Sequence, residues 1–285
     1  MSAPPRRHPV WDNHFHMDPA GRGVEAVKEF ERAGGTHLML VHKPYGLNRT
    51  LDDHARAFET TLAQAARARE ATQVKVFVAL APHPAELTEL LKAGVPMEEA
   101  AAVHRAALEL AQRHVREGRA VAMAEVGRPH WRPVDEPVMA VANELMEHAF
   151  ALARDAGCAV QIHAETATPE SFADLAAHLD RARLPRERAV KHYSTPIVDT
   201  AVNHGLWPSV LIGKGSAEEA AKGGARFLME TDYMDDPRYP GAVLGPKTVP
   251  RRTADMLAKG QLSEEQAWAV HAENPRRAYG VDVAL

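Results

Sequence analysis

Residues 10–18 read VWDNHFHMD, a mostly apolar run typical of a buried β-strand, with two histidines near its end. Four later runs have the same form: AVAMAEVG (120–127), AVQIHAE (159–165), RAVKHYS (188–194) and RFLMETD (226–232). Histidine or carboxylate side chains stand at or near the end of each run: His14, His16, Glu125, His163, His192 and Asp232. Neutral imidazoles and carboxylates are the ligands that divalent cations accept, zinc above all. These runs therefore indicate a metal-dependent enzyme.

Strand-like and helix-like segments alternate along the whole chain. Further strands are predicted at 37–44, 74–82 and 207–215, in addition to the five runs above. Helices are predicted at 23–35, 51–70, 84–117 (as two helices), 136–156, 169–181, 196–204, 216–223, 248–259 and 263–272. Strands and helices in this order are typical of α/β proteins with a parallel sheet.

The alternating pattern, without any linker, predicts a single (β/α)₈ TIM barrel domain over residues 1–285. A doubly wound open sheet is the alternative. In a barrel, catalytic residues converge from the C-terminal ends of several different strands, whereas an open sheet rarely brings five such ends together. The positions of the polar residues therefore favour the barrel, with the metal site at the C-terminal ends of its strands.

Composition excludes several classes of protein. The chain has 34 Lys and Arg against 38 Asp and Glu, and this net charge of −4 argues against a protein that coats nucleic acid or anionic membranes. No long apolar segment and no secretory signal are found, so we expect a cytoplasmic protein without a membrane partner. The lone cysteine, Cys158, excludes an internal disulfide and is expected to be a small buried thiol.

Local spacing supports the metal interpretation. His14 and His16 are two residues apart in a strand, so both imidazoles point to the same face and can reach one ion. Glu125 lies in a very apolar strand, where a buried carboxylate needs a cationic partner, either a metal or an arginine. In the last strand Glu230 and Asp232 are both candidate ligands. We favour Asp232 because Glu230 lies deeper in the barrel wall.

The chain resembles the TatD family of metal-dependent hydrolases, which are TIM barrels of the amidohydrolase type. The matching motifs span nearly the whole chain in the family's order: DNHFHMD (12–18) for D-x-H-x-H-x-D, APHP (81–84) for G-x-H-P, AEVG (124–127) for G-E-x-G, Ile162-His163, Lys191-His192, METD (229–232) for L-E-T-D, and NPRR (274–277) for the start of N-x-x-R-x-F. The resemblance implies a two-metal centre in this chain. His14, His16, Glu125 and Asp232 would bind one ion, and Glu125, His163 and His192 the other.

Several positions depart from the family's pattern. The family's G-E-x-G-L-D continues here as GRPHW (127–131), and Glu165 stands where an arginine is common. The family's H-C-F-S-G becomes HYSTP (192–196), and KTVP (247–250) replaces an N-E-P motif. The predicted metal ligands are therefore complete, whereas the positions that contact substrate differ. The reaction type transfers from the family, and the substrate does not.

Two divalent ions would activate a water, with Glu125 as their bridge and Asp232 as general base. Cationic and histidine side chains are predicted at the rim of the site, where they would bind substrate: Lys43, His83, Arg128, His130 and Lys214. Such a rim suits an anionic substrate, either a small molecule or the end of a nucleic acid, so we predict a phosphodiesterase or a deoxyribonuclease-like hydrolase.

Two alternatives stay open at this stage. The same centre could hydrolyse an amide, a lactone or another carboxylic ester, or the barrel could bind metal without turnover. Zinc is the first expectation for the metal, and manganese, magnesium, iron or nickel would also suit histidine and carboxylate ligands.

Overall fold

The structure is a computed structural model that describes residues 8–131 and 133–285. Its eight strands are all parallel and lie in chain order in one sheet. They are β1 (Trp11–Phe15), β2 (His37–Val41), β3 (Lys75–Ala79), β4 (Ala122–Gly127), β5 (Ala159–His163), β6 (Ala189–Ser194), β7 (Trp207–Leu211) and β8 (Leu228–Glu230). All eight predicted strands are confirmed, each shorter than the apolar run that indicated it.

The sheet closes between its first and last strands. Phe15 at the end of β1 forms a parallel bridge with Tyr233, which follows β8. The backbone N–H of His16 also donates to the carbonyl of Tyr233 at 2.8 Å. This closure confirms the (β/α)₈ barrel and rules out the open, doubly wound sheet, because an open sheet would leave β1 and β8 unpaired.

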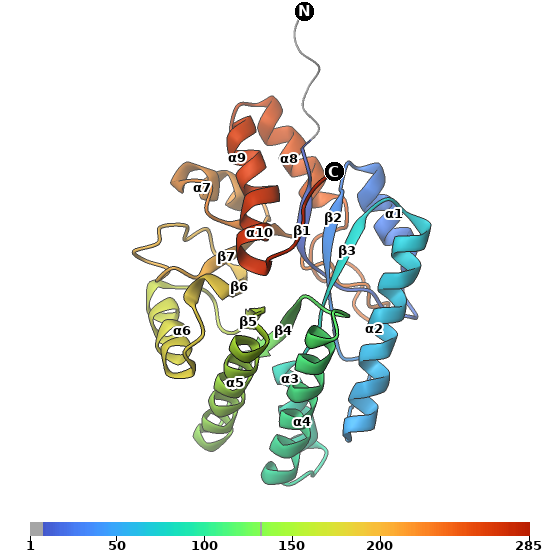
Figure 1. The fold of residues 1–285 in the computed structure, drawn as a ribbon, viewed down its shortest axis with the longest axis vertical. Helices are drawn as coiled ribbons and strands as arrows, with labels where there is room; N and C mark the ends of the chain where they lie inside the picture. The colour runs from blue at the N-terminus through green and yellow to red at the C-terminus, as the bar shows by residue number, and fades with distance from the viewer. Residues whose placement is uncertain (1–7, 132) are drawn as a thin grey trace, which may run out of the picture.

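Helices surround the strands (Figure 1). They are α1 (Val24–Arg32), α2 (Leu51–Ala71), α3 (Pro84–Lys92), α4 (Met97–Arg116), α5 (Glu136–Ala156), α6 (Pro169–Ala182), α7 (Ser216–Gly223), α8 (Thr248–Ala258), α9 (Glu264–Trp268) and α10 (Asn274–Tyr279), with short helical turns η1 (Arg186–Arg188) and η2 (Ala269–Glu273). The helix predicted over 196–204 is wrong. That segment forms turns, in which the side chain of Asp199 accepts from the N–H of Ala201 at 2.9 Å.

Local sequence explains where individual helices begin and end. Thr50 caps α2 by accepting from the N–H of Asp53, while the carboxylate of Asp53 accepts from the N–H of Thr50 at 2.9 Å. This reciprocal pair satisfies two N–H groups that have no partner within the helix. At the other end of the barrel wall, α5 stops at Gly157, whose φ of 69° suits glycine.

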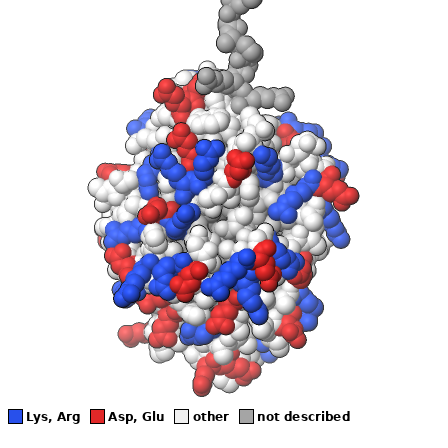
Figure 2. Space-filling view, viewed as in Figure 1, with Lys and Arg blue, Asp and Glu red and all other residues white. Residues whose placement is uncertain are grey.

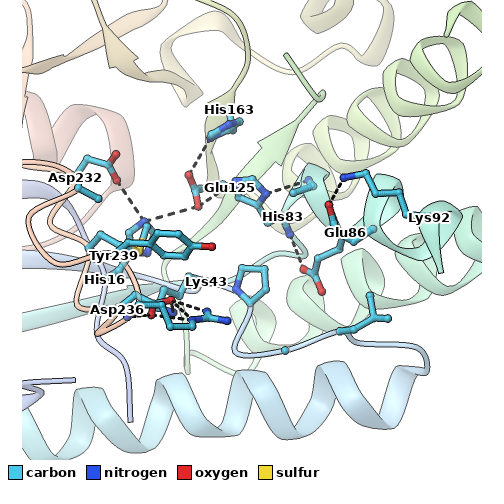
Figure 3. Close-up of a pocket in the computed structure, with 18 of the residues that line it drawn as sticks. His16, Lys43, His83, Glu86, Lys92, Glu125, His163, Asp232, Asp236 and Tyr239 are labelled. Atoms are coloured by element: carbon cyan, nitrogen blue, oxygen red, sulfur yellow. Dashed lines mark hydrogen bonds and ion pairs between the residues drawn. The ribbon is translucent and has the colours of Figure 1, made fainter. Parts of the chain in front are cut away.

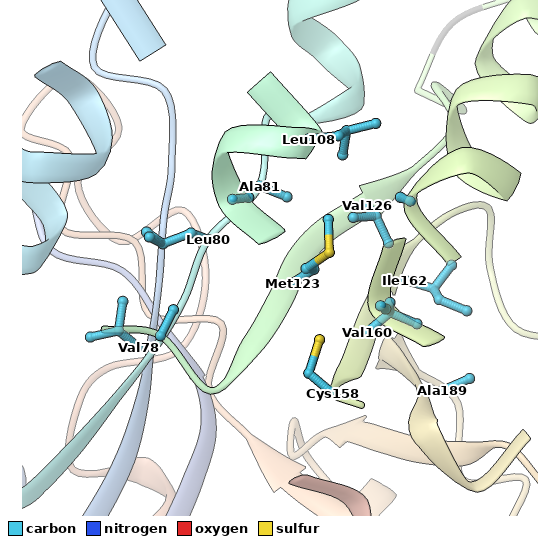
Figure 4. Close-up of a cluster of buried hydrophobic side chains, with 14 of the residues drawn as sticks. Val78, Leu80, Ala81, Leu108, Met123, Val126, Cys158, Val160, Ile162 and Ala189 are labelled. Atoms are coloured by element: carbon cyan, nitrogen blue, oxygen red, sulfur yellow. The ribbon is translucent and has the colours of Figure 1, made fainter. Parts of the chain in front are cut away.

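Alternate residues of the strands point to opposite sides of the barrel wall. On β2, Leu38 and Leu40 belong to the hydrophobic cluster that also contains side chains of the surrounding helices. Met39 and Val41 belong to a separate hydrophobic cluster inside the barrel. Figure 4 shows part of the outer cluster, in which Val78, Met123, Val160 and Ile162 contribute from successive strands. This period-two pattern fills the barrel from inside and covers it from outside.

Irregularities in strand pairing determine which way the polar side chains at the ends of β1 and β4 point. The pairing of β4 with β5 shifts between Met123 and Val126, both of which face the helices. Ala124 belongs to the inner cluster, and the extra residue of the shift lets Glu125 follow it toward the interior. A similar shift occurs on β1 between Asp12 and Phe15. These irregularities direct polar side chains toward the interior of the barrel, at positions where strict alternation would place apolar ones.

Two further expectations concern single features of the chain. Cys158 is buried among apolar side chains, and burial raises the pKa of its thiol to about 11, so it is an unreactive packing residue as predicted. None of the helices in the described parts of the chain has the length and apolar character needed to cross a membrane.

Candidate metal centre

The six predicted ligands lie together at the C-terminal end of the barrel. They come from five different strand ends, which is the convergence that the barrel topology predicts. Glu125 is buried, as are His14, His16 and His192, and Asp232 is only 8% exposed. Asp232 has a φ of 49°, a left-handed conformation that aspartate tolerates better than most residues. Residues that lie far apart in the sequence thus form a single cluster.

Glu125 occupies the middle of this cluster. Its Oε1 lies 3.0 Å from His163 Nδ1, 3.2 Å from His192 Nε2 and 3.5 Å from His14 Nε2. Its Oε2 lies 3.8 Å from both His16 Nε2 and His83 Nε2. The two oxygens of one carboxylate therefore face different imidazoles, with His14 on the same side as His163 and His192.

Asp232 also faces His14 and His16. Its Oδ1 lies 3.4 Å from His16 Nε2 and 3.8 Å from His14 Nε2, and those two ring nitrogens are 3.1 Å apart. His163 Nδ1 and His192 Nε2 are likewise 3.1 Å apart. Figure 3 shows Glu125 between His163 and His83, with Asp232 directed toward His16.

The outer nitrogens of three imidazoles are held by fixed acceptors. Gln161 Nε2 donates to the carbonyl of Asn13 at 2.9 Å, so its Oε1 is the atom that accepts from His14 Nδ1 at 2.7 Å. His16 Nδ1 donates to the carbonyl of Val41 at 2.9 Å, and His192 Nδ1 lies 3.2 Å from Glu230 Oε1. In the neutral rings, all three Nε2 lone pairs then point into the cluster.

Gln161 and Glu230 contact the cluster, and sequence reasoning missed or set them aside. Gln161 stands two residues before His163 on the same face of β5, and this spacing was the available signal. Glu230 is fully buried and accepts from the N–H of Tyr193 at 2.6 Å as well as contacting His192. It therefore fixes the ring of His192, consistent with the preference for Asp232 as the residue that faces the cluster.

The electrostatics of the cluster favour a cation. Burial would raise the pKa of Glu125, but His83, His14 and His163 outweigh it and hold that pKa well below its usual range. Burial would lower the pKa of His192, but Glu230 and Glu125 outweigh it and raise the pKa to about 10. The buried carboxylates thus hold a proton on an imidazole when no metal supplies positive charge, and a divalent ion would displace that proton.

Of the five predicted substrate contacts, His83 and His130 lie nearest the cluster. His83 caps α3, accepting with Nδ1 from the N–H of Ala85 at 3.0 Å, which turns its Nε2 toward Glu125. His130 is exposed, and its Nε2 lies 2.9 Å from His163 Nε2. Both histidines are therefore placed next to the predicted ligands.

The predicted cationic contacts are placed differently. Arg128 Nε donates to Glu165 at 2.9 Å and its Nη2 lies 2.7 Å from Asp174, so its guanidinium is taken up by carboxylates and does not line the cavity. Lys43 lines the cavity but pairs with Asp18 at 2.6 Å. Lys214 is exposed and lies outside the set of residues that line the cavity. Arg128 was expected at the rim because it follows the fourth strand, and the sequence did not indicate that Glu165, which follows the neighbouring β5, would pair with it.

The cluster forms the floor of a cavity of about 760 Å³. His16, Glu125, His163 and Asp232 reach it from the barrel, and His83 reaches it from the start of α3. Its remaining walls come from the segment after β2, from α3 and from the segment after β8. A small ester would fit in a cavity of this size.

The residues fit a divalent metal. A tetrahedral ion with ligands at about 2.1 Å places its ligand atoms about 3.4 Å apart, close to the distances found among these nitrogens and oxygens. Three sets of ligand atoms each fall within 4.8 Å of one another: those of His14, Glu125 and His192, of His14, His16 and Asp232, and of His83, Glu125 and His163. Glu125 and His14 each occur in two of these sets, so both lie where neighbouring sets of candidate ligands meet.

Comparison with known proteins bears on these observations directly. The family model for TatD related DNase matches residues 11–280. The chain belongs to the TatD family. An uncharacterized protein of Methanocaldococcus jannaschii is 40% identical over 281 residues, covering 97% of this chain and 98% of that protein. The resemblance inferred from the motifs is therefore confirmed.

Solved structures support the fold of this TatD protein. A TatD-like protein from Archaeoglobus fulgidus has a TM-score of 0.64 at 19% identity, covering 95% of this chain and all of the other. The 2,6-dihydroxybenzoate decarboxylase of Rhizobium has a TM-score of 0.55 at 11% identity, covering 96% and 99%. At such identities the likeness concerns the barrel alone. The family and the ligand clusters together support a metal-dependent hydrolase.

Proposed function

We propose that this TatD protein hydrolyses phosphoesters with a binuclear divalent-metal centre bridged by Glu125. The observation that carries the proposal is the position of the Glu125 carboxylate, whose two oxygens face different groups of imidazole nitrogens. The lone pairs directed inward by Gln161, Val41 and Glu230 support the same conclusion. A buried cluster of two carboxylates and four imidazoles needs positive charge, and divalent ions would supply it in place of the proton held on His192.

Each ion would have its own ligands besides the shared carboxylate. His14, His16 and Asp232 would hold one ion, and His163 and His192 the other. When bound, the two ions supply positive charge to substrate oxygens and lower the pKa of a water toward neutrality. Zinc is our first expectation, and manganese, magnesium, iron or nickel would suit the same nitrogen and oxygen ligands.

Asp232 is the residue that we propose as general base. Its carboxylate lines the cavity beside His16 and His14. Burial would raise its pKa, but the hydrogen bond from His16 and the charges of neighbouring histidines lower it, so the carboxylate is ionised at neutral pH. Its Oδ atoms can therefore accept a proton from the attacking water and return it to the leaving oxygen.

His83 is the residue that we propose as a substrate contact. Its Nδ1 accepts from the backbone of α3, so Nε2 carries the hydrogen in the neutral ring. That N–H points into the cavity near Glu125, where it can donate to a substrate oxygen. His130 is hydrogen-bonded to His163 and would fix the orientation of the His163 ring.

One observation favours hydrolysis of an amide, lactone or carboxylic ester as the second candidate. Arg128 and Lys43, predicted to bind a phosphate, are each paired with carboxylates. A neutral carbonyl substrate would need no such cations. A barrel that binds metal without turnover is the third possibility, and the position of Asp232 in the cavity argues against it.

A panel of substrates separates these candidates. Metal-loaded protein is assayed on bis(4-nitrophenyl) phosphate, 4-nitrophenyl acetate and a lactone, beside Asp232→Ala and the exposed control Asp255→Asn. We expect turnover of the phosphodiester by the parent and by Asp255→Asn, reduced about 10²-fold or more in Asp232→Ala. Turnover of the phosphodiester no faster than in Asp232→Ala, together with activity on the ester or lactone, would establish the second candidate instead.

A further inference from the structure

The cations on the cavity wall outside the metal cluster are paired with carboxylates. The lining includes the cations Lys43, Lys92 and Arg238 and the carboxyl groups of Glu86, Glu89 and Asp236, besides the predicted ligands, and burial raises the pKa of Glu86 to about 7. This pairing sets a limit on the charge that a substrate can carry into the cavity.

Every one of the three cations already contacts a carboxylate. Lys43 Nζ lies 2.6 Å from Asp18 Oδ2 and 3.2 Å from Asp236 Oδ2. Arg238 Nε donates to Asp236 Oδ1 at 2.9 Å, and Lys92 pairs with Glu89 on α3. The buried carboxylate of Glu86, in contrast, accepts from Asn48 Nδ2 at 2.7 Å and from the N–H of His83 at 2.9 Å. The wall therefore offers no surplus of positive charge.

On the face drawn in Figure 2, Lys and Arg side chains are interspersed with Asp and Glu. Affinity for a nucleic-acid strand comes mainly from phosphates neutralised by several Lys and Arg side chains. Only the metal centre would supply excess positive charge here, which suffices for one anionic group at the cavity floor.

Beyond that group, the cavity presents apolar side chains. Pro44 and Leu47 come from the segment after β2, and Met234, Tyr239 and Ala242 from the segment after β8. Leu47 is 41% exposed and Tyr239 is 60% exposed, so large apolar surfaces are free to contact a ligand. Arg238 lies over the Tyr239 ring at 5.7 Å from its centroid and so helps to hold it.

We infer that the substrate is a small ester with a single anionic group and an uncharged, apolar or aromatic substituent, and not a nucleic-acid strand. The anionic group reacts at Glu125 and Asp232, and the substituent packs against Leu47, Met234 and Tyr239. This inference rests on the proposed phosphoesterase function and specifies its substrate class.

Two phosphodiesters with the same charge and leaving group test the apolar wall. Bis(4-nitrophenyl) phosphate and methyl 4-nitrophenyl phosphate differ only in the substituent that stays on phosphorus. After correction for their uncatalysed rates, we expect kcat/KM to be about tenfold higher or more for the diaryl ester. The preference should shrink in Leu47→Ala and Tyr239→Ala. It should persist in Trp268→Ala, which removes an exposed aromatic side chain on α9 outside the cavity.

Binding of DNA provides a readout that does not depend on turnover. A fluorescein-labelled single-stranded 20-mer and the corresponding dinucleotide are titrated with the metal-loaded Asp232→Ala protein. A strand of ~20 nucleotides is longer than any one pocket, so it could make contacts that the dinucleotide cannot. We expect the two DNAs to bind equally weakly. The dependence of their affinity on salt concentration should correspond to about one neutralised phosphate. Asp236→Asn in the same background would free Arg238 and leave Lys43 paired with Asp18 alone, and it should strengthen binding of the longer strand.

The outcomes separate the inference from the function on which it rests. Equal kcat/KM for the two diesters, or affinity that rises with strand length and falls steeply with salt, overturns the inference and leaves the phosphoesterase standing. Turnover of neither diester above the Asp232→Ala level overturns both. A diaryl preference that Leu47→Ala and Tyr239→Ala reduce, with weak binding of both DNAs, supports the inference.

Discussion

The Nε2 atoms of His14 and His16 lie 3.1 Å apart, although the Nδ1 atom of each ring is already the donor to a fixed acceptor. In neutral rings, two lone pairs then face each other inside the protein, which is unfavourable unless positive charge lies beside them. Asp232 and Glu125 approach the same pair of nitrogens. The geometry of these two histidines thus calls for positive charge between them, which a bound proton or a metal would supply.

Gln161 should control metal affinity without contacting the ion. Its Oε1 accepts from His14 Nδ1, and its Nε2 is fixed by Asn13 and by Tyr279 Oη at 2.8 Å. Gln161→Leu removes the acceptor, so His14 can rotate or change tautomer. We expect metal affinity to fall about 10- to 100-fold, as measured by competition with a chelator. The matched control is Gln112→Leu on α4, whose side chain donates to the carbonyl of Leu152 far from the cluster.

Gly127 should be essential for the close approach of β4 to β5. A Cβ at this position would lie 1.8 Å from the carbonyl oxygen of His163, and its φ of 157° is itself unfavourable for other residues. We expect Gly127→Ala to destabilise the fold by about 3 kcal/mol or more in denaturant unfolding. Gly213→Ala, where nothing lies within 4 Å of the added Cβ, is the control. Equal stability of the two variants would show that β4 and β5 can move apart freely.

The barrel and the six clustered residues could be predicted because they follow from local patterns. Strands are marked by apolar runs, and polar residues at strand ends converge by topology alone. Pairings between separate segments could not be predicted in this way. Arg128 and Glu165, both departures from the family's pattern, contact each other across β4 and β5, and neither residue's neighbours in sequence indicate this. The same holds for Lys43, which pairs with Asp236 from a distant segment.

The register shift in β4 explains why the direction of one predicted ligand could not be derived from the sequence. Strict alternation along β4 would place Glu125 on the helix side, beside Met123, because the two residues are two apart. The register shift before Val126 adds one residue and reverses that expectation. The motif identified Glu125 as functional, whereas the backbone irregularity that turns it inward is not visible in the sequence.

Arg128 should contribute to stability and not to substrate binding. Its guanidinium lies between Glu165 and Asp174, which are both partly exposed, so solvent weakens the pairing. We expect Arg128→Met to lower the free energy of unfolding by about 1–2 kcal/mol and to leave KM for bis(4-nitrophenyl) phosphate unchanged. A raised KM with unchanged stability would restore Arg128 to the substrate site.

Acid should destabilise the protein partly through His271. Its ring accepts from the N–H of Trp11 at 3.1 Å and contacts Thr253 Oγ1 at 2.9 Å, and burial lowers its pKa from 6.5 to about 4. Its stabilising effect is complete above pH 6.5, where the ring is neutral in both states. The effect declines as the pH falls to about 4, by about 1.4 kcal/mol per pH unit.

The substitution His271→Asn isolates that contribution, since the amide can still accept from Trp11 and does not titrate. In metal-free buffer, the difference in unfolding free energy between parent and variant should shrink as the pH falls from 6.5 to about 4. Parallel pH profiles for the two proteins would mean that His271 is not held neutral by the fold.

The shared role of Glu125 is the centre of this account, and a crystal structure of metal-loaded protein with anomalous diffraction tests it most directly. We predict two anomalous peaks about 3.5–4 Å apart, with one oxygen of Glu125 on each ion. His14, His16 and Asp232 should surround one peak, and His163 and His192 the other. A single peak, or two peaks without Glu125 between them, would contradict the account.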